Sequence, residues 1–388
     1  MAGKTIVILG GGFGGVTAAL ELRRTLASEH TVTLIERRPM FMMGLRKLWV
    51  LTGRSSRQQG QRSLSTLRAK GIDLRQATIT AIETRARVVR TDEGPVRFDY
   101  LIVALGAEPR PDLVPGFSPV SFNLYDADDV ERLAARVATF SGGRIVIAIL
   151  GLPYKCPPAP YEAAMLLDDV FRQRGIRNAV EIQTFTPQPM SLPVVGAAGC
   201  AQVEGHLASK GIAFTPNRKA LRLEGNTVIF DGITIIADLL IGVPPHRPPS
   251  VVRESGLPMS GEWITVDPTM LRTSVDGIFA VGDVVEIPLA NSMTLPKAGI
   301  FAEGHAKVAA AAIIAEIIGR TAPPAYDGKG YCFIEVGGRR ASMIKGDFFT
   351  RPAPTVEITP PSEETFQQKL QFERTRLVSW FESSIRYR

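Results

Sequence analysis

The sequence of 388 residues predicts an α/β protein with two parallel-sheet units and a C-terminal α+β region. Two patterns predict this class: an apolar strand at residues 5–9 that runs into a glycine turn and a helix, and a second apolar strand at residues 143–150. The first pattern is typical of a Rossmann-like dinucleotide-binding domain, and the second repeats it in degenerate form. We expect the following segments, the first and third of which form one unit: 1–110, 111–245, 246–325 and 326–388.

Composition and charge narrow the classes of function. Hydrophobic residues make up 45% and charged residues 21%, which is ordinary globular composition and excludes a disordered chain. The net charge is +7, but no basic run has interleaved aromatic residues, so we expect small anions rather than nucleic acid as partners. Three cysteines do not form a disulfide framework, and four scattered histidines lack the spacing of metal ligands, so we expect no metal. The lack of a leader pattern and of an 18-residue apolar run favours a cytoplasmic protein.

A glycine-rich turn, GGGFGG at residues 10–15, joins the first strand to the first helix. Its spacing is G-x-G-x-x-G: Gly10 makes the tight turn, Gly12 lets the backbone approach a pyrophosphate, and Gly15 lets the helix pack on the strand. The N–H groups at the start of the helix then face the negative charge. A second strand at residues 31–35 ends at Glu36, whose carboxylate accepts hydrogen bonds from an adenosine ribose in such units. The first unit is therefore predicted to bind a dinucleotide.

Two later segments indicate which dinucleotide it is. Residues 98–107 form an apolar strand that leaves through a glycine, and residues 277–283 form another that ends in Gly282-Asp283. With the glycine turn, these segments resemble in order the three fingerprints of the FAD-containing flavoproteins with two dinucleotide domains, the disulfide reductase superfamily. The resemblance implies bound FAD, with Asp283 at the ribityl chain. The residues that we expect at the cofactor are Gly10, Gly12, Phe13, Gly14, Gly15, Glu36, Arg37, Ala104, Gly106, Gly282, Asp283, Pro296 and Lys297.

The second unit has lost the nucleotide signature. Its strand at residues 143–150 is followed by GLPYKCPPAP at residues 151–160 instead of a second G-x-G-x-x-G. A tyrosine stands near the position of the third glycine, and four prolines restrict the backbone and remove N–H donors that a pyrophosphate needs. We therefore expect that NAD(P)H is not the electron donor.

The proline loop after this strand carries the most specific resemblance. Residues 154–162, YKCPPAPYE, closely resemble the cysteine loop of flavocytochrome c sulfide dehydrogenase and of sulfide:quinone oxidoreductase. Residues 295–299 (LPKAG), 330–337 (GYCFIEVG) and 372–381 resemble further segments of the same family, so the resemblance spans the full chain. It implies a redox pair of cysteines over the flavin, and by motif match this pair is Cys156 and Cys332.

The resemblance also implies roles around that pair. Hydrosulfide attacks a disulfide between Cys156 and Cys332 and leaves a persulfide and a thiolate, which can pass two electrons to FAD. Glu162 matches the family's acid/base residue, but it can equally begin a helix at residues 161–171, where an acid favours the N-terminal dipole. Cys200 is in no matching motif and is interpreted as a packing residue. Because no cysteine precedes Cys156, we expect the version of the mechanism that uses two cysteines.

The C-terminal segment has the pattern of an amphipathic helix. Ser362 can cap this helix, and basic residues flank its apolar face. The apolar residues at helical spacing are Phe366, Leu370, Leu377, Phe381 and Ile385, and the flanking cations are Lys369, Arg374, Arg376, Arg386 and Arg388. The helix suits a membrane interface near a quinone, peripheral on the inner face of the cell membrane. It equally suits packing on its own protein or on a second subunit.

The leading hypothesis is therefore the oxidation of sulfide, or of another small sulfur anion, with electrons passing through FAD to a quinone. A type II NAD(P)H:quinone reductase shares this fold, and the missing second glycine fingerprint argues against it. A flavin-binding protein with little turnover is a third hypothesis, and the paired cysteine motifs argue against that. A flavocytochrome-type enzyme would instead pass its electrons to a haem partner.

Overall fold

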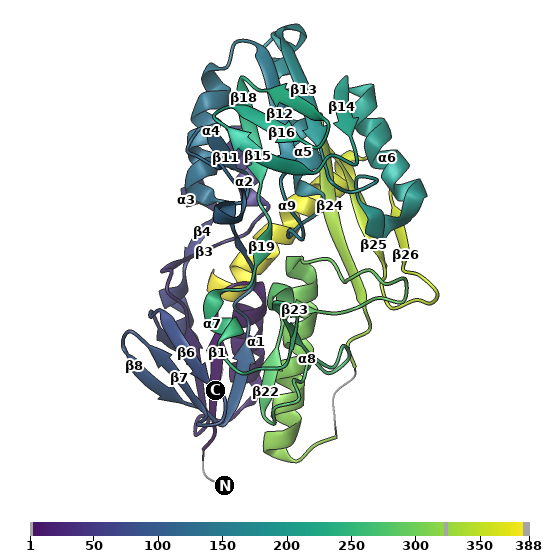
Figure 1. The fold of residues 1–388 in the computed structure, drawn as a ribbon. Coiled ribbons are helices and arrows are strands. Elements are labelled where there is room, and N and C mark those ends of the chain that lie inside the picture. The colour runs from purple at the N-terminus through teal and green to yellow at the C-terminus, as the bar shows by residue number, and fades with distance from the viewer. Residues whose placement is uncertain (1–2, 322–324, 383–388) are drawn as a thin grey trace.

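The computed structural model describes residues 3–321 and 325–382, and its two halves are each built around a five-stranded parallel sheet (Figure 1). The first sheet has the strand order β22-β9-β1-β2-β5, and its strands are β1 (Thr5–Leu9), β2 (Thr31–Ile35), β5 (Asp73–Arg75), β9 (Tyr100–Val103) and β22 (Ile278–Ala280). Apart from the edge strand β5, these short runs are rich in β-branched or other apolar residues and are mostly buried, as parallel strands covered on both faces are. Because β22 pairs with β9, segments far apart in the chain share one sheet.

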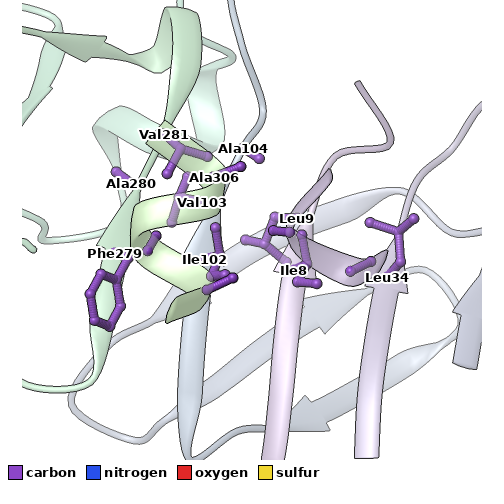
Figure 2. Close-up of a cluster of buried hydrophobic side chains, with 14 of the residues drawn as sticks. Ile8, Leu9, Leu34, Ile102, Val103, Ala104, Phe279, Ala280, Val281 and Ala306 are labelled. Carbon is purple, nitrogen blue, oxygen red and sulfur yellow. The ribbon is translucent and has the colours of Figure 1, made fainter. Parts of the chain in front are cut away.

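Two helices pack beside this sheet, α1 (Phe13–Thr25) and α8 (Gly299–Ile318). Figure 2 shows side chains from β1, β2, β9 and β22 meeting in one apolar cluster with Ala306 of α8. Ile8, Ile102 and Phe279 in this cluster are fully buried. The parallel register brings the carboxyl ends of β1, β9 and β22 to the same edge of the sheet. The glycines that follow these strands therefore meet at one place.

The second sheet has the order β11-β18-β12-β13-β14 and is also parallel throughout. Its strands are β11 (Ser121–Asn123), β12 (Gly143–Ile149), β13 (Val180–Phe185), β14 (Ile212–Thr215) and β18 (Leu239–Val243). The helices of this unit are α4 (Ala127–Thr139), α5 (Ala159–Gln173) and α6 (Gly196–Ser209). The predicted α/β class with two Rossmann-like units is confirmed. The division of the chain at residues 110, 245 and 325 stays a prediction.

Smaller elements connect and flank these units. Their strands form antiparallel or mixed sheets: β3 (Met40–Met42) with β4 (Gln61–Ser63), β6 (Ile79–Glu83) with β7 (Val88–Thr91) and β8 (Gly94–Arg97), β10 (Glu108–Pro109) with β19 (His246–Arg247), β15 (Ala220–Glu224) with β16 (Thr227–Phe230) and β17 (Ile233–Ile236), and β20 (Met259–Ser260) with β21 (Trp263–Thr265) and β23 (Val285–Glu286). The short helices are α2 (Arg46–Leu51), α3 (Arg57–Gly60) and α7 (Ser250–Arg253).

The C-terminal region is an antiparallel sheet followed by a helix that crosses the middle of the molecule between the two large sheets (Figure 1). Its elements are β24 (Lys329–Gly337), β25 (Arg340–Asp347), β26 (Thr355–Ile358), α9 (Glu363–Leu377) and a π-helical turn, η6 (Val378–Glu382). The Ser362 hydroxyl caps α9 by accepting the N–H of Thr365 at 3.0 Å. Within residues 3–321 and 325–382, no helix is both long enough and apolar enough to cross a bilayer.

The apolar face of α9 packs on the protein itself. Phe366, Leu377 and Phe381 are buried and Leu370 is half-buried. Lys369 corrects the sequence interpretation: it is 2% exposed, not a flanking surface cation, because two acidic side chains pair with its ammonium inside the protein. The remaining predicted members of the amphipathic pattern, Ile385, Arg386 and Arg388, lie outside the described residues.

Candidate active site

The glycine turn between β1 and α1 is held by close backbone contacts. A Cβ atom on Gly15 would lie 1.8 Å from the carbonyl oxygen of Gly10, and one on Gly10 would lie 2.5 Å from the carbonyl oxygen of Ala104. Gly10 also has a φ of +99°, which residues with side chains rarely adopt. Gly12 and Gly106 differ, because a Cβ atom on either would meet nothing within 4 Å. The turn is therefore tightly packed towards the protein and open at Gly12.

The open side presents hydrogen-bond donors to an anion. Gly12 is the N-cap of α1 without any side-chain cap, and the first turn of α1 has no acidic residue. Beside it, one carboxylate oxygen of Glu36 accepts the Gly11 N–H at 2.8 Å. The other oxygen accepts the backbone N–H and the Nε–H of Arg38, each at 3.0 Å. Burial raises the pKa of Glu36, but these bonds and the Arg38 charge outweigh burial and hold the pKa below its usual range. A phosphate fits the helix terminus, and ribose hydroxyls fit the ionised carboxylate.

Arg37 is the arginine predicted at the cofactor, whereas Arg38 is the one that contacts Glu36 in the structure. The guanidinium of Arg37 lies 2.6 Å from the Glu108 carboxylate on the surface, whereas Arg38 holds Glu36. Both arginines follow the strand directly, so the sequence alone does not show which one turns towards the glycine loop. The available signal was a pair of adjacent arginines, and only the three-dimensional structure shows that Arg38 is the one that contacts Glu36.

Phe13 and Gly14 connect the glycine turn to the rest of the core. The Phe13 ring packs edge-on against Trp380 of η6, with 5.3 Å between ring centroids, and lies 6.4 Å from Phe372 of α9. A Cβ atom on Gly14 would lie 3.1 Å from the side chain of Val281, just beyond β22. The C-terminal segment therefore packs directly on the predicted cofactor loop.

Gly282 and Asp283 follow β22 at the same sheet edge. Gly282 has a φ of +76°, and its N–H donates to Nδ1 of the buried His305 at 3.2 Å. Burial raises the pKa of Asp283, while the charges of Lys155 and Lys297 lower it. Two cations therefore face the carboxylate that the resemblance assigns to the ribityl chain.

Lys297 is fixed to the backbone of this edge. Its ammonium donates to the carbonyl oxygens of Asp283 and Val285, each at 2.9 Å, and lies 3.4 Å from the centroid of the Trp263 ring. Burial lowers the pKa of Lys297 to about 8. Pro296 and Lys297 line a small cavity together with Asp283. The lysine thus holds the loop before α8 against the end of β22.

Cys156 and Cys332 line one cavity. Cys156 lies in the loop between β12 and α5, and Cys332 lies on β24. Both are free thiols. The cavity has a volume of about 40 Å³, which is enough for a small ligand. Its other walls are apolar or aromatic: Pro157, Pro158, Leu192, Val194, Val195, Pro296, Ala298, Phe301, Tyr331, Ile344 and Phe348.

The backbone presents the Cys156 side chain to this cavity. Cys156 has a φ of +51°, which is uncommon for a residue other than glycine and often marks a functional position. Its N–H donates to the carbonyl of Lys297 at 2.7 Å, and its carbonyl accepts the hydroxyl of Tyr125 at 3.1 Å. Although the residue is exposed at the cavity mouth, the surrounding protein desolvates the sulfur and raises its pKa to about 11. The charge of Glu162 adds to this rise.

Glu162 lies in the first turn of α5 and within electrostatic reach of both cysteines. It is 3% exposed, and its carboxylate contacts the ammonium of Lys369. Burial raises the pKa of Glu162, and the positive charge of Lys369 opposes the rise. Burial, Cys156 and Glu162 together raise the pKa of Cys332 well above its usual range. Both thiols therefore stay protonated at neutral pH unless a base or a cation assists.

Side chains fill the carboxyl edge of the second sheet, where an intact unit would bind its nucleotide. A Cβ atom on Gly151 would lie 2.7 Å from the ring of Pro245. The Tyr125 ring lies 6.3 Å from Tyr154 and 4.7 Å from His246, and all three side chains are buried. α5 begins with prolines and has an acidic residue in its first turn. This helix terminus lacks the donors that the start of α1 offers.

Cys200 stands apart from the cavity. It lies on α6, is 2% exposed and belongs to the apolar core around the second sheet. Two residues that the sequence did not connect to the cysteine segments are Lys369 and Glu335, whose Nζ and Oε1 atoms lie 3.0 Å apart. The available signal was a glutamate within the matched segment GYCFIEVG and a lysine in a helix of otherwise apolar spacing.

Comparison with known proteins identifies the family. Residues 4–311 match the family model of pyridine nucleotide-disulphide oxidoreductases, which is most of the chain. The chain belongs to this family. Pyridine nucleotide-disulphide oxidoreductases are flavin oxidoreductases, so the protein is an oxidoreductase.

Relatives similar to this chain include two enzymes whose names refer to a quinone. The mitochondrial sulfide:quinone oxidoreductase of Mus musculus is 23% identical, over 97% of this chain and 85% of its own. A demethylphylloquinone reductase of Synechocystis is 26% identical, over 75% of this chain and 74% of its own. The X-ray structure of the sulfide:quinone oxidoreductase of Aquifex aeolicus has a TM-score of 0.84 at 24% identity, covering 97% of this chain and 91% of that one. This likeness shows the shared fold.

The residues at the first sheet fit FAD, the cofactor of pyridine nucleotide-disulphide oxidoreductases. The fit rests on the open space at Gly12 and Gly106, on the uncapped start of α1 and on the ionised Glu36. The second sheet has no comparable opening at Gly151.

Proposed function

We propose that the protein oxidises sulfide through Cys156 and Cys332, with FAD as the two-electron acceptor and a quinone as the final one. One observation carries the proposal: a cysteine after β12 and a cysteine on β24 line a single cavity. Pro296 and Ala298, which precede α8 at the cofactor edge of the first sheet, line the same cavity. Two thiols beside the predicted flavin site suit the exchange of a sulfur atom and two electrons.

The cysteine pair supplies the covalent chemistry. Hydrosulfide attacks one sulfur of the oxidised pair, an S–S bond forms to the incoming sulfur, and the bond between the cysteines breaks with its electron pair on the leaving thiolate. The thiolate and the new persulfide then join through the added sulfur, which releases one proton and two electrons. Glu162 is the candidate acceptor of the proton. FAD, when bound, supplies the site that accepts the two electrons.

The quinone part of the proposal is supported by the names of the two relatives, both of which refer to a quinone. A quinone acceptor would place the protein peripherally at a membrane surface, on the inner face of the cell membrane. The apolar face of α9 does not support this location, since that face packs on the protein itself. Membrane contact, if it occurs, therefore needs another surface.

A type II NAD(P)H:quinone reductase is the second candidate, because the Synechocystis relative is named a quinone reductase without sulfide. The filled edge of the second sheet disfavours it. Pro245 leaves no space beside Gly151, and the tyrosine and histidine rings occupy the neighbouring positions. A flavin-binding protein with little turnover is disfavoured by the shared cysteine cavity.

Anaerobic titration of the purified yellow holoprotein tests the proposal. Sulfide and NADH are added separately, and the flavin absorbance is followed in a stopped-flow instrument. We expect sulfide to bleach the flavin at least about a hundredfold faster than NADH, a difference of about 2.7 kcal/mol in the barrier. Rapid, stoichiometric reduction by NADH would favour the second candidate. Reduction by neither would favour the flavin-binding protein.

A further inference from the structure

A buried cluster of charges connects both cysteine segments to the C-terminal helix. The ammonium of Lys369 on α9 contacts Glu162 on α5 and lies 3.0 Å from Oε1 of Glu335 on β24. Glu162 follows Cys156 by six residues along the chain, and Glu335 follows Cys332 by three. One buried cation therefore joins an acid from each cysteine segment.

The two carboxylates of this cluster are held unequally. Glu335 also accepts the indole N–H of Trp49 at 2.6 Å and a guanidinium N–H of Arg54 at 2.6 Å. Among the described residues, Lys369 is the one hydrogen-bond partner of the Glu162 carboxylate. Without the Lys369 ammonium, Glu335 would stay paired, but Glu162 would be a buried carboxylate without compensation. A buried acid in that situation takes up a proton rather than staying charged.

We propose that Lys369 is a positioning residue: its ammonium stabilises the ionised form of the Glu162 carboxylate beside the cysteine cavity, where Glu162 takes up a proton that the cysteine pair releases on oxidation. In the sulfide reaction the joining of the thiolate and the persulfide releases one proton. Oxidation of the two free thiols to one S–S bond releases two protons and two electrons, which FAD, when bound, would accept. Glu162 accepts the first proton, and water at the exposed Cys156 accepts the second. The inference rests on the proposed function for its electron acceptor but not for its sulfur donor.

Three charged groups and one neutral tyrosine face Glu162 from four parts of the chain. Burial raises the pKa of Glu162, Glu335 on β24 raises it further, and Lys369 on α9 lowers it. Arg54, after α2, also lowers it. Tyr125, between β11 and α4, is within electrostatic reach of Glu162 and stays neutral because burial raises its own pKa. The sign of each neighbour therefore predicts the direction in which its removal moves the titration of Glu162.

Three variants of the holoprotein test the inference through the pH profile of flavin reduction by sulfide. Lys369→Met removes the cation at similar length, and we expect the acid limb to move up by at least about one pH unit. Lys369→Arg keeps the charge and should leave the limb in place. Glu335→Gln removes a charge that raises the pKa of Glu162, so the limb should move down. A purely structural role does not produce shifts of opposite sign.

An unmoved acid limb in a Lys369→Met protein that keeps its flavin would overturn the inference. If Lys369→Met does not fold, Glu335→Gln decides, and an upward or absent shift in that variant overturns the inference as well. The alkylation rate of the reduced thiols by iodoacetamide gives a readout that needs no sulfide activity. The Glu162 charge raises the pKa of both thiols more strongly than the Lys369 charge lowers it. If Glu162 becomes neutral in Lys369→Met, alkylation at fixed pH should therefore be as fast as in the unchanged protein or faster, and Lys369→Arg should leave the rate unchanged. Slower alkylation in Lys369→Met would mean that Glu162 stays ionised without Lys369, which contradicts the inference even if sulfide proves not to be the substrate.

Discussion

The two parallel sheets follow the same plan, yet the edges at which they would bind a nucleotide differ in every feature that matters for binding. At the first edge, α1 starts without a cap or an acid, and Gly12 faces open space. At the second, α5 starts with prolines and a buried acid, and Gly151 is closed by Pro245. The strands that support both edges are equally buried. The difference shows that a sheet and the site at its edge can change independently. The roughly ten residues that follow one strand determine whether a nucleotide can bind there.

Removing either member of the cysteine pair should have the largest effect, because the second edge carries Cys156 where the first carries a glycine turn. We expect Cys156→Ser or Cys332→Ser to keep the flavin spectrum and to lose about a thousandfold or more of the sulfide-driven reduction rate. Stopped-flow reduction under anaerobic conditions measures it. Cys200→Ser is the matched control and should stay within about twofold of the unchanged protein. Normal reduction in both single variants would mean that the second edge contributes no chemistry.

Adding one methyl group at each edge separates packing from cofactor binding. Gly15→Ala forces a Cβ atom against the carbonyl oxygen of Gly10. This variant should lose about 4 kcal/mol of unfolding free energy, and it should also lose FAD binding. Gly12→Ala meets no protein atom, so the apoprotein should keep its stability while FAD binds more weakly. Gly151→Ala must displace the Pro245 ring and should cost about 1–3 kcal/mol without changing FAD affinity. Urea unfolding of the apoproteins and fluorescence titration with FAD measure both quantities. If Gly151→Ala weakened FAD binding as much as Gly12→Ala or Gly15→Ala does, the assignment of FAD to the first edge alone would be contradicted.

The C-terminal turn η6 packs on the first edge through the contact of Trp380 with Phe13. Trp380→Ala should cost about 3 kcal/mol of unfolding free energy, as buried aromatic truncations do. It should also weaken FAD binding, because Phe13 belongs to the glycine turn. Thermal unfolding of the holoprotein and flavin release measure the two effects. Trp380→Phe keeps most of the contact and serves as the control, and unchanged FAD affinity in Trp380→Ala would show that the packing does not reach the cofactor.

One buried histidine at each edge should give the smallest effect. Burial lowers the pKa of His246 to about 2 and that of His305 to about 3, whereas an unfolded histidine titrates near pH 6.5. Between about pH 6 and pH 4 the unfolded chain therefore binds a proton that the folded chain does not. The free energy of unfolding should fall by about 1.4 kcal/mol per pH unit for each histidine as the pH decreases.

The difference in this slope between the unchanged protein and the His246→Asn or His305→Asn variant measures the contribution of each edge. Urea unfolding at several pH values from 4 to 6.5 gives the slopes. Each variant should lose the slope of one histidine. A variant whose slope equals that of the unchanged protein would show that its histidine is protonated in the folded state.

Local patterns predicted the strands of the first unit well. The strands expected at residues 5–9 and 31–35 match β1 and β2, because a β-branched apolar run between glycine or polar residues specifies a buried strand almost by itself. The helix expected at residues 161–171 instead spans Ala159–Gln173, since proline is tolerated in the first turn of a helix. The glycine turn and the second apolar strand were likewise sufficient for the fold class.

Long-range packing was out of reach of the sequence. The spacing of Phe366, Leu377 and Phe381 shows that α9 has an apolar face, but not whether protein or lipid covers it. The same limit applies to Lys369, whose acidic partners lie on two other elements far along the chain. Motif matches named Cys156 and Cys332, and only the three-dimensional arrangement brings them to one cavity.

The contact between Phe13 and Trp380 also bears on how the chain is made. Ribosomes add about 5–20 residues per second, so Trp380 follows Phe13 after roughly 20 to 70 s of synthesis. Until the C-terminal region is made, the glycine turn lacks Phe372 and Trp380, two of the aromatic side chains that pack on Phe13, and the first sheet lacks β22 until residue 280 has been added. A nascent chain therefore completes the apolar support of this loop only after η6 has been made. We expect tight FAD binding to begin only after η6 has been synthesised.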